Sequence, residues 1–138
     1  MDIHRVTASD IAILAKLNHQ LIKDEGHRNP MSVDELEKRM SSWLSSGYFA
    51  ALFSELDEIV GYTLWRQDEG FIYIRQFFIT PDFRGKGNGK KAFYLSRDQF
   101  WSGQKLRLDV LINNHRGLEF WHAVGFGDYC ITMENTSL

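Results

Sequence analysis

The chain has a single cysteine, two prolines and no long apolar run among its 138 residues. One cysteine, Cys130, excludes an internal disulfide, and no Cys/His spacing predicts a zinc site. No segment approaches the ~18 apolar residues that a membrane span needs, and the amino-terminal residues do not resemble a signal peptide. We therefore expect a cytoplasmic protein with no metal and no membrane partner.

The chain also lacks a marked excess of charge of either sign. Its formal net charge is −2, whereas a nucleic-acid binder usually shows a strongly basic face, so we expect no nucleic-acid partner. Hydrophobic residues make up 43% of the composition, which is enough to build a core. The length is typical of one domain, and we expect a single domain over residues 1–138.

Hydrophobic periodicity predicts a strand and two helices in the first third of the chain. Residues 3–6 form the expected strand. Apolar residues at helical spacing then predict one helix ending near Gly26 and a second ending near Gly47. Each helix is preceded by residues typical of a capping box, Thr7 with Asp10 and Ser32 with Glu35.

The pattern then changes to that of strands joined by short turns, which predicts an antiparallel meander. A helix, a strand, a helix and a last strand follow. We expect an α/β (α+β) fold with a mixed, mostly antiparallel central sheet flanked by helices, in the order β-α-α-β-β-β-α-β-α-β. The segments after the first two helices are expected at 48–56, 59–67, 71–80, 87–101, 106–112, 115–124 and 129–133.

A glycine-rich turn, Arg84-Gly85-Lys86-Gly87-Asn88-Gly89, lies between an expected strand and an expected helix. The first N–H groups of a helix lack intrahelical partners and carry partial positive charge, and glycines let a ligand approach the backbone closely. Lys90 and Lys91 oppose the helix dipole, which is reasonable if an anion binds there. The turn predicts an anion site; a flexible basic turn without a ligand is the alternative.

Two common glycine motifs do not fit this turn. The phosphate loop of NTPases needs glycine six positions before Lys90 and Ser or Thr after it, but Arg84 and Lys91 occupy these positions. The dinucleotide fingerprint needs glycine at position 90. A nucleotide site is therefore disfavoured.

Two segments together resemble the GNAT superfamily of N-acetyltransferases. The run from Ile79 to Gly89 resembles its acetyl-CoA motif, Arg/Gln-x-x-Gly-x-Gly/Ala, and the run from Asn114 to Phe126 resembles its second motif. The expected order of strands and helices is also similar, so the resemblance spans nearly the whole chain. It implies acetyl-CoA as co-substrate, no metal, and transfer of an acetyl group to an amine, either of a small molecule or of a peptide.

The resemblance implies a cofactor site in three parts. Backbone groups at 77–79 fall where the pantetheine arm pairs like an added strand, and those at 85–90 fall where the diphosphate is held. The Asn114 side chain falls near the thioester, and the strands at 71–80 and 106–112 are expected to splay apart. The expected cofactor-binding residues are Phe77, Phe78, Ile79, Arg84, Gly85, Lys86, Gly87, Asn88, Gly89, Lys90 and Asn114.

The chain departs from the family pattern at two positions. Gly117 replaces a small alanine, and Trp121 replaces the tyrosine whose hydroxyl is often proposed to protonate the leaving thiolate. An indole N–H is a donor but not a useful acid. Three alternatives follow: the thiolate leaves unassisted, which we favour, another group serves, or the protein is a non-catalytic acyl-CoA-binding or regulatory module.

Asp109 is the expected catalytic base. An amine must lose a proton when it attacks a thioester, and Asp109 alternates with apolar residues on the strand that leads to Asn114. The alternative is an exposed carboxylate paired with Arg107 or a nearby lysine. No nucleophilic Cys or Ser with a basic partner suggests an acyl-enzyme, so we expect direct transfer in a ternary complex.

Two polar residues are candidates for contact with the acceptor. Arg75 and Gln76 lie on a strand that should line the acceptor groove, whereas Tyr73 and Tyr129 are expected to be packing residues rather than functional hydroxyls. The family often dimerises, and the sequence neither requires nor excludes a homodimer.

The loop between the first two helices carries Asp24, Glu25 and His27, which could attract a cationic amine. A charged surface loop without this role is the alternative, and it is slightly favoured.

Overall fold

The computed structural model of the chain describes residues 1–26 and 28–137. Its elements are, in order, β1 (Asp2–Arg5), the 3-10 turn η1 (Ala8–Asp10), α1 (Ile11–Asp24), α2 (Val33–Ser45), β2 (Tyr48–Glu55), β3 (Glu58–Asp68), β4 (Phe71–Ile79), the 3-10 turn η2 (Pro81–Phe83), α3 (Asn88–Phe100), β5 (Leu106–Arg107) and α4 (His115–Ala123).

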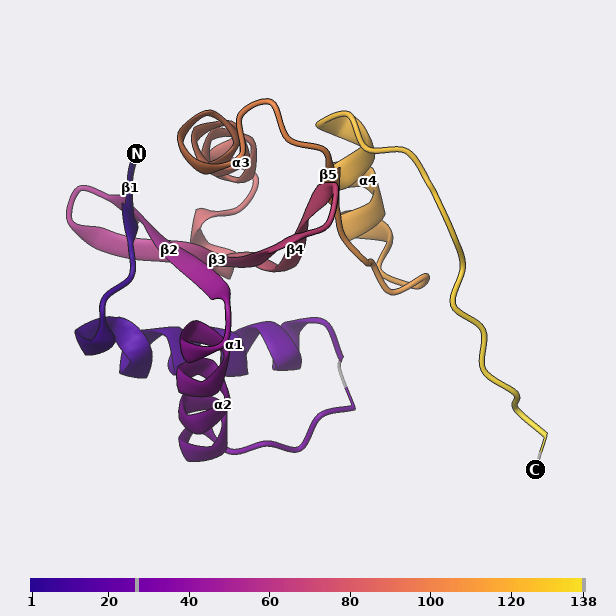
Figure 1. The fold of residues 1–138 in the computed structure, drawn as a ribbon, viewed down its shortest axis with the longest axis horizontal. Coiled ribbons are helices and arrows are strands. Elements are labelled where there is room, and N and C mark those ends of the chain that lie inside the picture. The colour runs from indigo at the N-terminus through magenta and orange to yellow at the C-terminus, as the bar shows by residue number, and fades with distance from the viewer. Residues whose placement is uncertain (27, 138) are drawn as a thin grey trace.

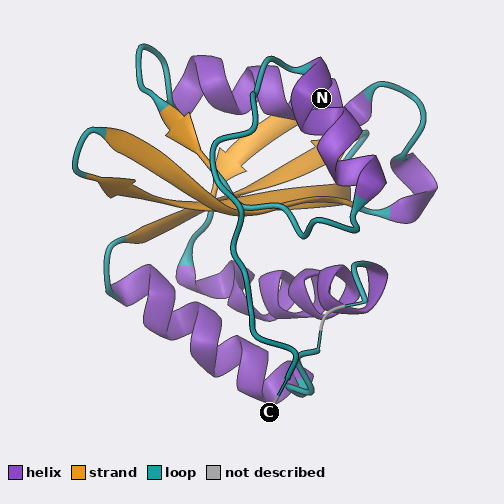
Figure 2. Ribbon diagram, turned by 90° about the vertical axis from the view of Figure 1, so that its right-hand side faces the viewer, coloured by secondary structure: helices purple, strands orange, loops and turns teal. Residues whose placement is uncertain are grey.

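The strands form a sheet in the order β1-β2-β3-β4-β5 that lies between two layers of helices (Figures 1 and 2). Helices α1 and α2 cover one face, and α3 and α4 cover the other (Figure 1). Neighbouring strands from β1 to β4 are antiparallel, and β4 pairs with β5 in parallel. This mixed, mostly antiparallel sheet confirms the predicted fold class.

The first helical layer begins at the predicted caps. The Glu35 N–H donates to Ser32 Oγ (3.2 Å), and the Ser32 N–H donates to the Glu35 carboxylate (3.1 Å). The Thr7 N–H donates to the Asp10 carboxylate (2.9 Å), although this cap starts η1, from which α1 continues directly.

In the part of the chain that the structure describes, no helix is both long and apolar enough to cross a membrane.

A β-bulge in β4 decides which side chains face the first helical layer. Trp65 pairs with Ile74 and Leu64 pairs with Gln76, so Arg75 is an extra residue on β4. Ile74 packs on the α3 side of the sheet, whereas the bulged Arg75 contacts Tyr48 of β2 and Gln76 accepts a hydrogen bond from Tyr62. The bulge therefore places two consecutive polar side chains on the α1/α2 face.

The strand predicted at 106–112 is much shorter in the structure. Only Leu106 and Arg107 pair with β4, opposite Ile72 and Tyr73, and the chain then leaves the sheet. The alternation of apolar residues predicted a longer strand, but Ile112 at its end is 71% exposed. No strand within residues 1–26 and 28–137 pairs with the outer edge of β4 beyond Tyr73, and this open edge is the expected splay.

The last predicted strand, at 129–133, is wrong: this segment carries no strand among the described residues. Tyr129, Ile131 and Met133 are 78%, 72% and 87% exposed, and β5 is too short to offer a neighbouring edge. The prediction relied on strand-forming residue types, whose preference depends on packing against a sheet. Instead the C-terminal segment runs past the sheet towards the first helical layer, where Glu134 pairs with Arg28 at 3.1 Å (Figure 2).

Candidate active site

The glycine-rich turn presents a row of open backbone N–H groups. Gly85 and Gly87 have φ of 76° and 77°, and a Cβ at either would meet no atom within 4 Å, so the backbone conformation and not crowding favours glycine. The first helical hydrogen bond of α3 runs from the Lys91 N–H to the Gly87 carbonyl (3.1 Å). None of the described residues accepts a hydrogen bond from the N–H groups at 85–90, which makes this turn fit an anion such as a diphosphate.

Arg84 and Asn88 shape the turn with their side chains. Arg84 Nε donates to the Ile79 carbonyl (2.8 Å), and its Nη2 forms an ion pair with Asp24 at 2.8 Å. Asn88 Nδ2 donates to the Phe83 carbonyl (2.9 Å) from a buried position. The Arg84 N–H also has a partner, the Pro81 carbonyl (3.2 Å). Arg84 therefore holds the turn in place through contacts within the protein.

Residues 77–79 form the open end of β4 that leads into this turn. The Phe77 side chain lies on the α3/α4 side, stacked on Phe120 at 6.0 Å between ring centroids, and Phe78 packs against Tyr62 on the opposite face. Because β5 ends beside Tyr73, the backbone edge at 77–79 is free of a neighbouring strand in the described chain. Apart from the Ile79 carbonyl, which accepts a hydrogen bond from Arg84 Nε, this open edge is followed along the chain by the row of N–H groups in the turn. The order suits an extended arm that ends in a diphosphate.

Asn114 caps α4 at the other side of the splay. Its Oδ1 accepts a hydrogen bond from the Gly117 N–H (3.0 Å). A Cβ at Gly117 would lie 2.5 Å from Asn114 Nδ2, which explains why glycine replaces the alanine of the motif. At Gly89 a Cβ would lie 2.9 Å from Cε1 of Phe120, so the first turn of α3 contacts α4 closely.

Trp121 belongs to an aromatic cluster between the sheet, α3 and α4. Its ring centroid lies 4.9 Å from Phe120, 5.2 Å from Phe126 and 5.3 Å from Phe77. The indole therefore packs beside the open end of β4, and its large apolar area stabilises the contact of α4 with the sheet.

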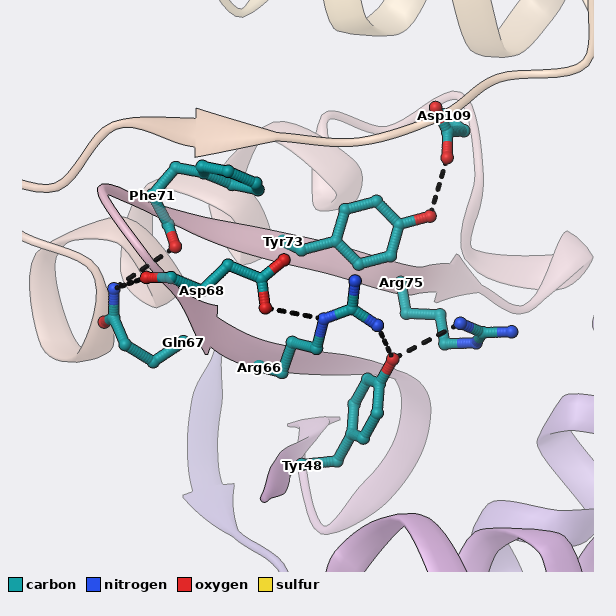
Figure 3. A network of polar contacts seen from close by, with 8 residues as sticks. All are labelled: Tyr48, Arg66, Gln67, Asp68, Phe71, Tyr73, Arg75 and Asp109. Atoms are coloured by element: carbon teal, nitrogen blue, oxygen red, sulfur yellow. Dashed lines mark hydrogen bonds and ion pairs between the residues drawn. The ribbon is translucent and has the colours of Figure 1, made fainter. Parts of the chain in front are cut away.

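Asp109 accepts a hydrogen bond from the Tyr73 hydroxyl at 2.7 Å (Figure 3). Tyr73 is the last β4 residue that pairs with β5, so this contact lies where the two strands separate. Burial, with a smaller contribution from Asp109, raises the pKa of Tyr73 to about 12. Asp109 is exposed, as the alternative predicted, but it forms no ion pair with any described residue, and Arg107 lies over the Phe71 ring (4.1 Å). The predicted pairing of Asp109 with Arg107 or a nearby lysine is therefore wrong.

Three arginines lie on the α1/α2 face of the sheet, near the contact between Tyr73 and Asp109. The Tyr48 hydroxyl accepts hydrogen bonds from Nη1 of Arg66 (2.5 Å) and from Nη1 of Arg75 (3.2 Å), and Arg66 Nε donates to Asp68 (2.7 Å) (Figure 3). Arg39 of α2 completes the group. Apart from Arg75 and Gln76, the sequence offered no signal for this cluster, because it is assembled from separate elements by the bulge in β4.

The remaining candidates are less well placed. Asp24 is paired with Arg84, and the charge of Glu25 contributes, after burial, to raising the pKa of Tyr62. His27 lies outside the described residues. Tyr129 is exposed with Arg107 over its ring (4.8 Å), and Cys130 is an exposed free thiol. Within the described parts of the chain, no cluster of three or more His, Cys, Asp or Glu side chains gathers as a metal site would.

Several solved structures with similar folds are named as possible, predicted or known acetyltransferases. They include a possible acetyltransferase from Clostridium difficile 630 (18% identity, TM-score 0.78, covering 99% of this chain and 97% of that one). A predicted acetyltransferase with acetyl-CoA from Clostridium acetobutylicum is 16% identical, with a TM-score of 0.73 over 98% of this chain and 95% of that one. At these identities the likeness shows the fold.

A third similar structure is that of AAC(6')-Iy in complex with the bisubstrate analogue CoA-S-monomethyl-acetylneamine (14% identity, TM-score 0.75, covering 99% of this chain and 98% of that one). A search of the curated proteins finds no match in sequence. The acetyltransferase (GNAT) family, by contrast, has a model that matches residues 16–126, which is most of the chain, and the protein therefore belongs to the GNAT family of acetyltransferases.

Proposed function

We propose that the protein transfers an acetyl group from acetyl-CoA directly to a primary amine within a ternary complex. The observation that carries this proposal is the continuous path from the open edge of β4 at 77–79 to the unpartnered N–H groups at 85–90. A bound diphosphate would satisfy the N–H groups of the turn. An added strand would pair with the part of the β4 edge that is still open, because the Ile79 carbonyl already accepts a hydrogen bond from Arg84 Nε. The Gly85 and Gly87 conformations, with open space at both positions, fit such a ligand.

In this proposal Asp109 is the base. The amine nitrogen forms a bond to the thioester carbonyl carbon, its proton passes to Asp109 directly or through water, and the C–S bond breaks to release the thiolate. The Tyr73 hydroxyl, which stays protonated well above neutral pH, holds the Asp109 carboxylate in one orientation. Backbone N–H groups on the open β4 edge are the candidates to polarise the carbonyl.

Asn114 is proposed to contact acetyl-CoA through its Nδ2, since its Oδ1 is already held by the Gly117 N–H. Trp121 packs among Phe120, Phe126 and Phe77 and offers no acid. We therefore propose that the thiolate leaves without protonation by that residue. We also propose a cytoplasmic location, which suits the exposed thiol of Cys130.

The experiment is to follow CoA release by the purified chain with a panel of small amines, amino acids, aminoglycosides and peptide N-termini. Asp109→Asn should lower the rate at neutral pH by about a hundredfold or more, since general bases contribute on that scale, and should change the shape of the pH–rate profile. Asp98→Asn is the control, because Asp98 is exposed on α3 and paired with Arg97 at 3.0 Å. An unchanged pH–rate profile would remove Asp109 from the base role.

A non-catalytic acyl-CoA-binding module is the second candidate, supported by Trp121 at the position of the family's tyrosine. Such a module would bind acyl-CoA along the same path as the proposed transferase but would not transfer the acyl group to an amine. Saturable CoA binding, measured as a thermal shift, without acetylation of any amine in the panel would favour it.

A further inference from the structure

Arg39 and Arg75 lie over the same indole ring on the α1/α2 face of the sheet. The Cζ atoms are 4.4 Å and 4.7 Å from the ring centroid of Trp43, a residue of α2. Stacking on an aromatic face orients a guanidinium and leaves its N–H groups at the edge available. The two arginines therefore form a preoriented cationic pair, which we call the Trp43 arginine pair.

The Trp43 arginine pair has donors that no part of the described chain uses. Arg39 Nη2 donates to Asn18 Oδ1 (3.1 Å) and Arg75 Nη1 donates to the Tyr48 hydroxyl (3.2 Å), but neither guanidinium forms an ion pair within residues 1–26 and 28–137. Arg39 Nε is moreover buried without a hydrogen-bond partner among these residues. Because this nitrogen is buried, a bound anion would contact other N–H groups of the two guanidinium groups.

Two nearby carboxylates are already engaged. Asp68 binds Arg66, and Asp109 accepts the Tyr73 hydroxyl. Burial lowers the pKa of Arg39, and the nearby positive charge of Arg75 lowers it further. A third guanidinium, that of Arg66, lies over the Tyr73 ring at 4.7 Å, but its charge is paired with Asp68.

We propose that the amine acceptor carries an anionic group, a carboxylate or a phosphate, which binds the Trp43 arginine pair while its amine faces Asp109 and Tyr73. The proposal rests on the acetyl-transfer function proposed above and deepens it by naming the acceptor class. Planar guanidinium groups bind carboxylate and phosphate oxygens through charge-assisted hydrogen bonds. The same arginines disfavour an acceptor with several positive charges, such as an aminoglycoside.

The test compares ω-amino carboxylates with diamines of the same chain length and with aminoalkyl phosphates. Binding to the full chain is measured by calorimetry in the presence of CoA, and acetylation is measured in parallel. The anionic acceptors should bind about tenfold or more tightly than the diamines, the difference expected from a charge-assisted hydrogen bond. The stronger of the two anionic series identifies the group as carboxylate or phosphate.

Arg39→Gln and Arg75→Gln should each weaken binding of the anionic acceptors about tenfold and leave CoA binding unchanged. Lys38→Gln is the matched control, since it removes a positive charge from the same helix at a position outside the Trp43 arginine pair and should change neither. Because Arg39 is partly buried, Arg39→Lys serves as a second variant that keeps the charge. Diamines that bind as tightly as the amino carboxylates, or arginine variants that weaken both series equally, would overturn the proposal.

The binding measurements separate this inference from the proposed function. Arginine-dependent binding of anionic amines without acetylation would contradict the proposed transferase activity and support the anionic acceptor site. Acetylation of diamines in preference to amino carboxylates would support the proposed transferase activity and contradict the anionic acceptor site.

Discussion

Asn114 combines a structural and a proposed functional contact in one side chain. Its Oδ1 accepts the Gly117 N–H at the first turn of α4, and its Nδ2 remains for acetyl-CoA. Since a Cβ at Gly117 would lie 2.5 Å from that Nδ2, the glycine preserves the position of the amide. The two contacts can be separated because aspartate caps a helix as well as asparagine but has no N–H to donate.

Asn114→Asp should therefore keep the free energy of unfolding within about 0.5 kcal/mol and raise the KM for acetyl-CoA, whereas Asn114→Ala should also lose about 1 kcal/mol through the missing cap. Denaturant unfolding and steady-state kinetics measure the two effects. Ser32→Ala is the control, because it removes an equivalent cap from α2, away from the proposed cofactor path. If the KM of the Asn114→Asp variant were unchanged, Asn114 would cap α4 but would not contact acetyl-CoA.

The predictable part of the site is the part that is contiguous in the sequence. The glycine-rich turn and the Asn114 segment could be recognised because their geometry is local: one turn and one helix start. The position of Asp109 before the Asn114 segment can be predicted from the sequence and the family resemblance, but its contact with Tyr73 cannot, because it joins residues 36 positions apart. The Trp43 arginine pair joins α2 to a bulged position of β4, and no local sequence pattern predicts such a bulge.

At the scale of elements, helices and the β2–β4 meander could be predicted because their apolar periodicity and caps are strong local signals. The strands after α3 could not. Leu106, Leu108 and Val110 alternate like a strand, yet the chain leaves the sheet after Arg107. A continued strand would have paired along β4, and that edge is the one that the proposed cofactor path keeps open.

The turn before α3 allows a test of backbone conformation against ligand binding. Gly87 precedes α3 with φ of 77°, and Gly70 lies in the β3–β4 turn with φ of 85°; a Cβ added at either position would meet no atom within 4 Å. Alanine should destabilise the fold by about 1–2 kcal/mol at either position, because a left-handed conformation strains any residue with a Cβ. The two glycines thus form a matched pair.

Only Gly87→Ala should also weaken CoA binding, by about tenfold, since a change in the turn misaligns the N–H groups proposed to hold the diphosphate. Calorimetric titration with CoA measures the affinity, and ATP tested in competition distinguishes a CoA site from a general phosphate site. Equal CoA affinities of the two variants would show that the turn does not bind the diphosphate.

At the scale of the whole molecule, the sheet separates two environments. The α3/α4 side is closed by an aromatic cluster. The α1/α2 side has an apolar core as well, but it also holds buried and half-buried polar groups between helices and sheet. Tyr62 is fully buried there and donates to Gln76 (2.7 Å), and burial raises its pKa well above the ordinary value. Tyr73, nearer the edge, has its pKa raised to about 12.

These two tyrosines predict a loss of stability at alkaline pH. In the unfolded chain a tyrosine has a pKa of about 10, so above that pH the unfolded state holds fewer protons than the folded state. The free energy of unfolding should then fall as pH rises from 10 through 12, the value of Tyr73, with a slope of at most about 1.4 kcal/mol per pH unit for each tyrosine.

Urea unfolding at a series of pH values up to 12 measures this slope. Tyr73→Phe should flatten it without affecting the fold, since the phenyl ring keeps its packing and Asp109 remains accessible to water. Tyr62→Phe should flatten it as well, but with a lower stability at neutral pH, because Gln76 loses its buried donor. Tyr129→Phe, at an exposed position, is the control and should follow the curve of the unchanged protein. If the Tyr73→Phe curve also ran parallel to it, the hydroxyl at the splay would not be held protonated by the fold, and its proposed hold on Asp109 would fail with it.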